Sequence, residues 1–136
     1  MTPEHLPHAD RYQQGLECLQ RVDGPQGVAV VQDLAESFPD FARYLVEFPF
    51  GDIYARRSLG LREREIATVA ALTALGNAAP QLRVHIHAAL HVGCSPAQIV
   101  ETVMQMAVYA GFPAALNGLA VVREVFLAHG IALPLP

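Results

Sequence analysis

Charged residues are scarce in this sequence, which limits how a folded monomer could cover its surface. They make up 16 % of the 136 residues, while hydrophobic residues make up 52 %. Ordinary soluble domains carry about 25 % charged residues. A compact monomer would leave much apolar surface uncovered, so we expect self-association to bury part of it. The length is typical of one domain, and we treat residues 1–136 as a single domain.

Long apolar runs and long basic runs are both absent. The longest uncharged, mostly apolar stretch covers residues 66–81 and is shorter than the roughly 20 apolar residues that a membrane span needs. The first ten residues lack the basic and then apolar pattern of a secretion signal, so we expect a soluble, cytoplasmic protein. No basic run is longer than Arg56–Arg57, and the net charge is -4, which argues against a nucleic-acid partner.

Cysteine pairs are missing as well. The two cysteines, Cys18 and Cys94, lie far apart in the sequence and form neither a CxxC motif nor a zinc-type spacing. We therefore interpret both as small buried residues of a cytoplasmic protein. We expect no metal centre.

Helix-capping residues are frequent in the second half of the chain. Gly93 closes one helix, Ser95 is the N-cap of the next, and Pro96 follows at its first position. Gln98 completes a capping box with Ser95, and Gly111 ends the helix.

The same pattern predicts the neighbouring helices. Pro80 opens a helix that ends at Gly93, and Pro113 opens one that ends at Gly130. Residues 61–76 begin with charge and are then apolar all round, which predicts a helix buried on every side.

The first half carries weaker patterns. Residues 8–22 predict an amphipathic helix and residues 27–38 a shorter one, although the valines of 28–31 also fit a strand. A further helix is expected over residues 39–48, followed by an irregular connector over 48–60. Together the patterns predict an all-α fold, a single compact helical domain of about six or seven helices.

Three of the six histidines lie between residues 84 and 94. On a helix His87 and His91 share a face, whereas His85 points nearly opposite to His87. The His87/His91 spacing suits a metal, but no HExxH motif or nearby carboxylate ligand accompanies it. We therefore interpret this pair as surface or interface residues.

The surroundings of His85 differ, because its neighbours one turn away, such as Leu82 and Ala89, are apolar. A histidine in this position is either a core residue bonded to a carbonyl group or a pocket residue. In a pocket it could transfer protons near neutral pH.

Four of the nine positive charges gather just before the apolar helix. Arg56, Arg57, Arg62 and Arg64 could receive a carboxylate, or they could pair with neighbouring acidic side chains. Glu65 is the last charged residue before the apolar run, so it is either partly buried or placed to favour the positive helix N-terminus.

Residues 12–126 resemble the carboxymuconolactone decarboxylase family of the alkylhydroperoxidase-D-like superfamily. The resemblance rests on two blocks, FGDIYARRSLGLREREIATVAALTALG and LRVHIHAALHVGCSPAQIVETVMQMAVYAGFPAALNGLAVVREVF. It implies an all-α, alkylhydroperoxidase-D-like fold and a ring-like homo-oligomer, commonly a trimer or hexamer.

The superfamily contains a peroxidase branch and a decarboxylase branch. The peroxidase pattern CxxCxxxH would place cysteines at Ala78 and Gln81, so both thiols of that cycle are missing. The decarboxylase branch uses no cofactor and removes CO2 from 4-carboxymuconolactone in the catabolism of aromatic acids. The resemblance therefore implies a carboxy-lyase acting on a small carboxylated lactone.

The resemblance also assigns roles to individual residues. The implied site contains His85 as the proton-transfer residue, Glu65 as its orienting or second acid–base group, Arg56 and Arg64 as carboxylate anchors, and Tyr54 and Tyr109 as pocket lining. The sequence has no tryptophan, which decarboxylase relatives carry near Phe50 or Tyr54, so the particular lactone stays open. The alternative functions are a non-catalytic oligomeric binding protein of the same fold and, against the missing CxxC motif, a thiol-dependent peroxidase.

Overall fold

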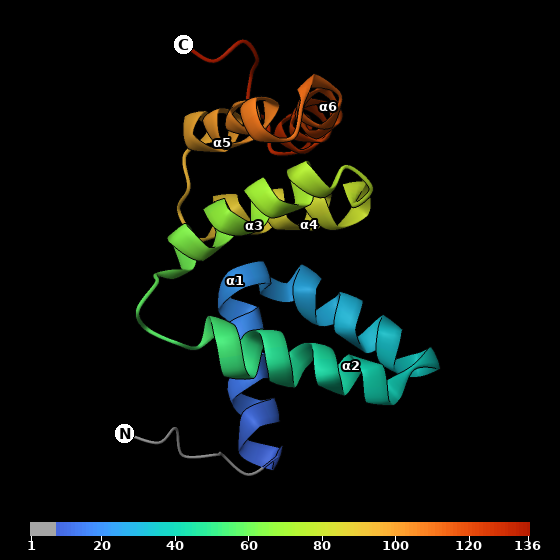
Figure 1. Ribbon diagram of the computed structural model, residues 1–136. Coiled ribbons are helices and arrows are strands. Elements are labelled where there is room, and N and C mark those ends of the chain that lie inside the picture. The colour runs from blue at the N-terminus through green and yellow to red at the C-terminus, as the bar shows by residue number, and fades with distance from the viewer. Residues whose placement is uncertain (1–7) are drawn as a thin grey trace. The chain divides into compact units, whose positions relative to one another are not determined.

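The computed structural model describes residues 8–136, with side chains described from Asp10 onward. Its elements are α1 (His8–Ser37), α2 (Pro39–Leu45), the π-helix η1 (Val46–Tyr54), α3 (Leu61–Leu75), α4 (Ala79–His91), α5 (Pro96–Tyr109) and α6 (Phe112–Ala128) (Figure 1). No strand occurs in this part of the chain, so the all-α prediction is confirmed. The chain divides into two compact units, Met1–Leu59 and Gly60–Pro136. Single-domain behaviour stays a prediction.

The first unit is built on the long helix α1. The two helices expected over 8–22 and 27–38 are its two halves, joined at a kink where Gly24 has φ 65° and Pro25 follows. Only glycine adopts such a φ readily, and proline removes one helix hydrogen bond, so a bend forms here. The valines of 28–31 are helical, which excludes the strand alternative.

The helix expected over 39–48 and the irregular connector expected over 48–60 are both partly wrong. The α-helix α2 stops at Leu45, and the chain continues as the wider helix η1 through Tyr54. Proline at position 49 lacks an N–H group, and a wider helical turn is one way to accommodate a missing hydrogen bond. Only the residues after Tyr54 form the expected connector.

Charged side chains bind η1 to α1. Arg11 of α1 donates from Nε and Nη2 to the two carboxylate oxygens of Asp52, at 3.0 and 2.6 Å. The same guanidinium lies 3.5 Å from the buried carboxylate of Glu47, which Arg43 of α2 approaches to 3.6 Å. A buried carboxylate needs such partners, so Arg11 fixes the position of η1 along α1.

Four α-helices make up the second unit. In Figure 1, α3 and α4 lie side by side as one layer and α5 and α6 form the other. Between the layers lies a core whose members include Val69, Ile86, Val103, Val122 and Phe126.

The predicted caps of this unit are confirmed. The Ser95 hydroxyl accepts from the Gln98 N–H at 3.1 Å, and the Gln98 side chain accepts from the Ser95 N–H at 3.0 Å. Gly93 and Gly111 have positive φ, 99° and 94°, just beyond their helices, as expected for helix-ending glycines.

Burial of α3 is less complete than expected. Only Glu65, Val69 and Thr73 are buried, while Ala67 and Leu75 are exposed. Alanine contributes four of the nine apolar residues of this helix, and a side chain this small gains little free energy from burial. Within residues 8–136 no helix combines the length and hydrophobicity of a membrane span.

A close backbone approach in the first unit yields a stability prediction. A Cβ atom at Gly15 would lie 2.1 Å from the carbonyl oxygen of Val46, which is main chain and cannot rotate away. Gly15→Ala should therefore lower the free energy of unfolding by about 2 kcal/mol, measured by urea denaturation. Gln20→Ala on the exposed face of α1 is the control and should change it by less than about 0.5 kcal/mol. Equal stability of the two variants would contradict the close packing.

Candidate functional site

Glu65 and His85 meet inside the second unit. Glu65 lies in the second turn of α3 and is fully buried, and its Oε2 is 2.9 Å from Nδ1 of His85 on α4. The two helices form a hairpin across residues 76–78, which places the residues side by side although 20 positions separate them. A buried carboxylate requires a hydrogen-bond donor, and the imidazole is a donor placed to meet that need.

The geometry defines how the two groups can work together. An ionised carboxylate only accepts, so the imidazole carries a hydrogen on Nδ1 and donates it to Glu65. This hydrogen bond orients the ring. The pair can therefore act as an oriented acid–base group, in which Nε2 of His85 exchanges a proton with a ligand.

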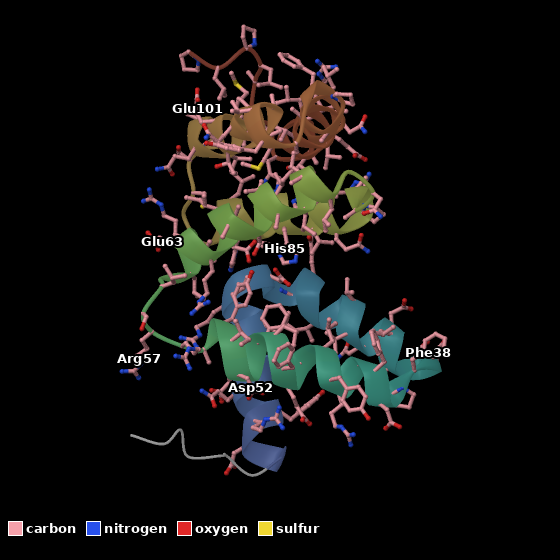
Figure 2. All side chains as sticks on the ribbon, viewed as in Figure 1. Phe38, Asp52, Arg57, Glu63, His85 and Glu101 are labelled. Atoms are coloured by element: carbon pink, nitrogen blue, oxygen red, sulfur yellow. The ribbon has the colours of Figure 1, made fainter. Side chains whose placement is uncertain are left out.

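His85 itself lies at the edge of the core. Leu82 and Ala89, one turn before and after it on α4, are buried as the sequence predicted. Its own side chain keeps 20 % of its surface exposed. Figure 2 labels this side chain on the second unit. His85 is thus not a fully buried core histidine. It contacts the carboxylate of Glu65, whereas a core histidine was expected to bond to a main-chain carbonyl group.

Arg64 precedes Glu65 in α3 and is half-buried. Its carbonyl oxygen accepts from the hydroxyl of Thr68 at 2.9 Å, a local bond within the helix. Arg64 is adjacent to Glu65 in the chain, but successive residues of a helix point about 100° apart, so its role as a carboxylate anchor stays a prediction.

Tyr54 and Arg56 belong to the first unit. Tyr54 ends η1, is half-buried, and packs its ring 5.2 Å from the ring of Phe50. Arg56 is exposed in the connector, where its N–H donates to the carbonyl of Ile53 at 3.1 Å.

Tyr109 is the last residue of α5 and is 81 % exposed. The structure therefore brings together Glu65 and His85, whereas the roles of Tyr54, Arg56, Arg64 and Tyr109 stay predictions.

Cys94 follows α4 and lies against the first turn of α3. It is 4 % exposed, and its Sγ–H donates to the carbonyl of Arg62 at 3.6 Å. Burial raises the pKa of the Cys94 thiol; Arg62 opposes the rise, and Glu65 and Glu63 add to it. Cys18 is also buried, and neither cysteine takes part in a disulfide.

The other histidines of α4 behave differently from each other. Nδ1 of His87 is 2.5 Å from Nε2 of His129, which follows α6. Burial lowers the pKa of His87, with His129 and Arg83 adding to the effect and Glu124 opposing it. His91 is exposed. Sequence reasoning missed His129, because nothing local marks a partner 42 residues away.

No group of three or more His, Cys, Asp or Glu side chains within the described part of the chain could hold a metal ion. The Glu65–His85 pair consists of one carboxylate and one imidazole, which is an acid–base arrangement.

Comparisons with known proteins bear on the same region. The sequence profile of the carboxymuconolactone decarboxylase family matches residues 39–124. The 4-carboxymuconolactone decarboxylase of Acinetobacter baylyi is 32 % identical over 123 residues, 90 % of this chain and 91 % of that protein. The uncharacterized 15.0 kDa protein in the nqo9-nqo10 intergenic region of Paracoccus denitrificans is 33 % identical over 89 residues, 65 % of this chain and 66 % of that protein.

The buried environment of Cys94 predicts that its thiol reacts slowly with alkylating reagents. In a Cys18→Ala variant, alkylation of Cys94 by iodoacetamide at pH 8 should be slower in the folded protein than in urea, since burial raises the pKa of the thiol and shields the sulfur from the reagent. The rate should still be rising at the pH where the unfolded chain has levelled off, because the folded pKa is the higher one. Equal rates in folded and unfolded protein would contradict this account.

Proposed function

Because the chain belongs to the carboxymuconolactone decarboxylase family, we propose that it is a cofactor-independent carboxy-lyase acting on a small carboxylated lactone such as 4-carboxymuconolactone. The family supports a decarboxylase-like role. The observation that carries the proposal is the 2.9 Å contact between buried Glu65 and partly exposed His85. We place the reaction in the cytoplasm, in the catabolism of aromatic acids.

The chemistry of decarboxylation explains why such a pair is useful. The bond between carbon and the leaving carboxylate breaks, CO2 departs, and the electron pair passes into the unsaturated lactone as an extended enolate. The enolate then takes a proton on carbon, so one proton replaces one CO2. The protein must hold the carboxylate, stabilise the developing oxyanion and deliver that proton.

His85 is assigned the proton. Its imidazolium donates from Nε2 to the substrate carbon and then regains a proton from solvent, which its partial exposure permits. Glu65 keeps the ring oriented through Nδ1 and stabilises its positive charge before the transfer. An acid held ready beside a developing carbanion contributes typically 10²- to 10⁴-fold.

The substrate's negative charges require positive partners. We assign Arg64 and Arg56 as the carboxylate anchors, because guanidinium groups bind carboxylates through paired hydrogen bonds. Tyr54 and Tyr109 supply pocket walls and hydroxyl donors. Of the four, Arg64 and Tyr109 belong to the same compact unit as Glu65 and His85.

A ring-like homo-oligomer, a trimer or hexamer, is part of the proposal. Val108, Tyr109 and Phe112 follow one another around the turn between α5 and α6 and are 73 %, 81 % and 72 % exposed. Three large apolar side chains this exposed are a liability on a monomer and are typical of an interface. Tyr109 can line a pocket only if another copy covers it.

The first test of the proposal measures turnover. His85→Gln keeps an N–H donor for Glu65 but has no acidic proton, so kcat for CO2 release from 4-carboxymuconolactone should fall by at least about 100-fold with no metal or cofactor added. Glu65→Gln should lower kcat as well, since it removes the charge that stabilises the imidazolium.

The matched control is His91→Gln, an exposed histidine on the same helix, which should keep wild-type kcat. Circular dichroism checks that each variant is folded. Wild-type turnover that survives His85→Gln would refute the role of His85. A folded wild type without turnover on carboxylated lactones would favour the non-catalytic binding protein.

The second test measures assembly. Val108→Asp combined with Phe112→Ser should convert the oligomer to smaller species in light scattering coupled to size-exclusion chromatography, because charge and polarity replace apolar contact area. Glu101→Lys changes an exposed charge two turns away on α5 and should leave the mass unchanged. A wild-type chain that runs as a monomer at micromolar concentration would overturn the ring.

A further inference from the structure

His87 and His129 form a cluster that the proposed reaction does not use. His87 lies two residues after His85 on α4, which turns its side chain by about 200° away from that of His85. Its Nδ1 faces Nε2 of His129 at 2.5 Å, and the two ring centroids are 4.7 Å apart with 42° between the planes. Both residues belong to the second unit, so the distance between them is set within one compact unit.

We propose that His87 and His129 together bind one divalent transition-metal ion of the borderline class, such as Zn²⁺, Ni²⁺ or Cu²⁺, at a site separate from Glu65 and His85. Imidazole nitrogen is a preferred ligand of all three ions. The two histidines supply two ligands, and water molecules fill the remaining coordination positions of the ion.

The distance between the facing nitrogens suits this role. Zinc–imidazole bonds are about 2.0–2.1 Å long, so two nitrogens bound to one ion at an angle near tetrahedral lie about 3.4 Å apart. The two facing nitrogens, 2.5 Å apart, must therefore separate by somewhat less than about 1 Å. His129 is exposed at the end of α6 and its side chain can make that movement.

The backbone around the pair is already fixed. His87 lies one residue after Ile86, which is fully buried, and His129 follows Phe126, which is also fully buried. The N–H of His129 points back to the carbonyl groups of Val125 and Phe126 at 3.0 and 3.1 Å. The two ligands are therefore held on rigid elements, which reduces the ordering that metal binding requires.

The charges nearby are compatible with a bound cation. His129 caps the carboxyl end of α6, where the unpaired carbonyl groups of a helix favour positive charge. Arg83, one turn before His87 on α4, is held by Glu124 of α6 at 2.9 Å. This ion pair balances the positive charge that Arg83 brings to the site.

Two other readings of these histidines exist, and variants separate them. In one, His87 and His129 share only an N–H···N hydrogen bond and bind no metal. In the other, the metal is held by His87 and His91, the helical pair that the sequence spacing suggests. The second reading makes His91→Gln weaken binding, whereas the proposed site makes it neutral.

The experiment titrates Zn²⁺ by calorimetry into the full-length, untagged chain carrying His5→Gln and His8→Gln, since the sequence places two further imidazoles there. One equivalent of Zn²⁺ per chain is expected. His129→Gln and His87→Gln should each weaken binding by roughly tenfold or more, as loss of a direct ligand should cost at least as much as loss of an outer-shell partner. His91→Gln should leave the affinity unchanged.

Paramagnetic resonance of the Cu²⁺ complex gives a readout independent of affinity. Hyperfine coupling to imidazole nitrogens should be present in the parent and reduced in His129→Gln, whose exposed position makes misfolding a poor explanation for any loss. Absence of Zn²⁺ binding, or binding that both His87→Gln and His129→Gln leave intact, would overturn the site. Weakening by His91→Gln but not by His129→Gln would replace it with the helical pair. None of these outcomes depends on decarboxylation.

Discussion

A carboxylate shut away from solvent on α3 is the constraint around which the second unit is organised. Glu65 has no exposed surface, so the chain must supply it with a donor. His85 does so at 2.9 Å, and this contact fixes the rotation of α4 against α3. With that rotation set, Ile86 enters the core and His87 is turned to the side where His129 lies. The buried carboxylate of Glu65 thus orients α4. Three successive residues of this helix then lie in the candidate site (His85), in the core (Ile86) and beside His129 (His87).

Local chemistry made much of the fold predictable. The Ser95–Gln98 capping box and the glycines at 93 and 111 act within one helical turn, so their outcome could be predicted from neighbours alone. Gly24 and Pro25 separate the two halves of α1, in agreement with the two helices expected there, whereas the π-helix after Leu45 was not predicted. The position of η1 along α1 depends on Arg11, which reaches Asp52 across 41 residues. No pattern of short period reports a contact of that range.

In the candidate site, too, some features could be predicted from the sequence and others depend on contacts between distant residues. The resemblance to a known family singled out Glu65 and His85, and the hairpin of α3 and α4 brings them into contact. Family membership is confirmed, as is the all-helical fold. From helical spacing alone, His87 and His91 were interpreted as surface or interface residues on one face. The structure pairs His87 with His129, since α6 packs alongside α4 and places its end at that point.

The burial of Glu65 also constrains how this protein could change during evolution. A lineage that loses His85 alone removes a charged hydrogen-bond partner from a buried carboxylate, and breaking a buried ion pair in this way typically destabilises a fold by about 3 kcal/mol or more. That is a large share of the stability of a small domain. Drift away from catalysis is therefore expected to proceed through paired replacements, with an apolar or amide residue entering at 65 when the imidazole at 85 disappears.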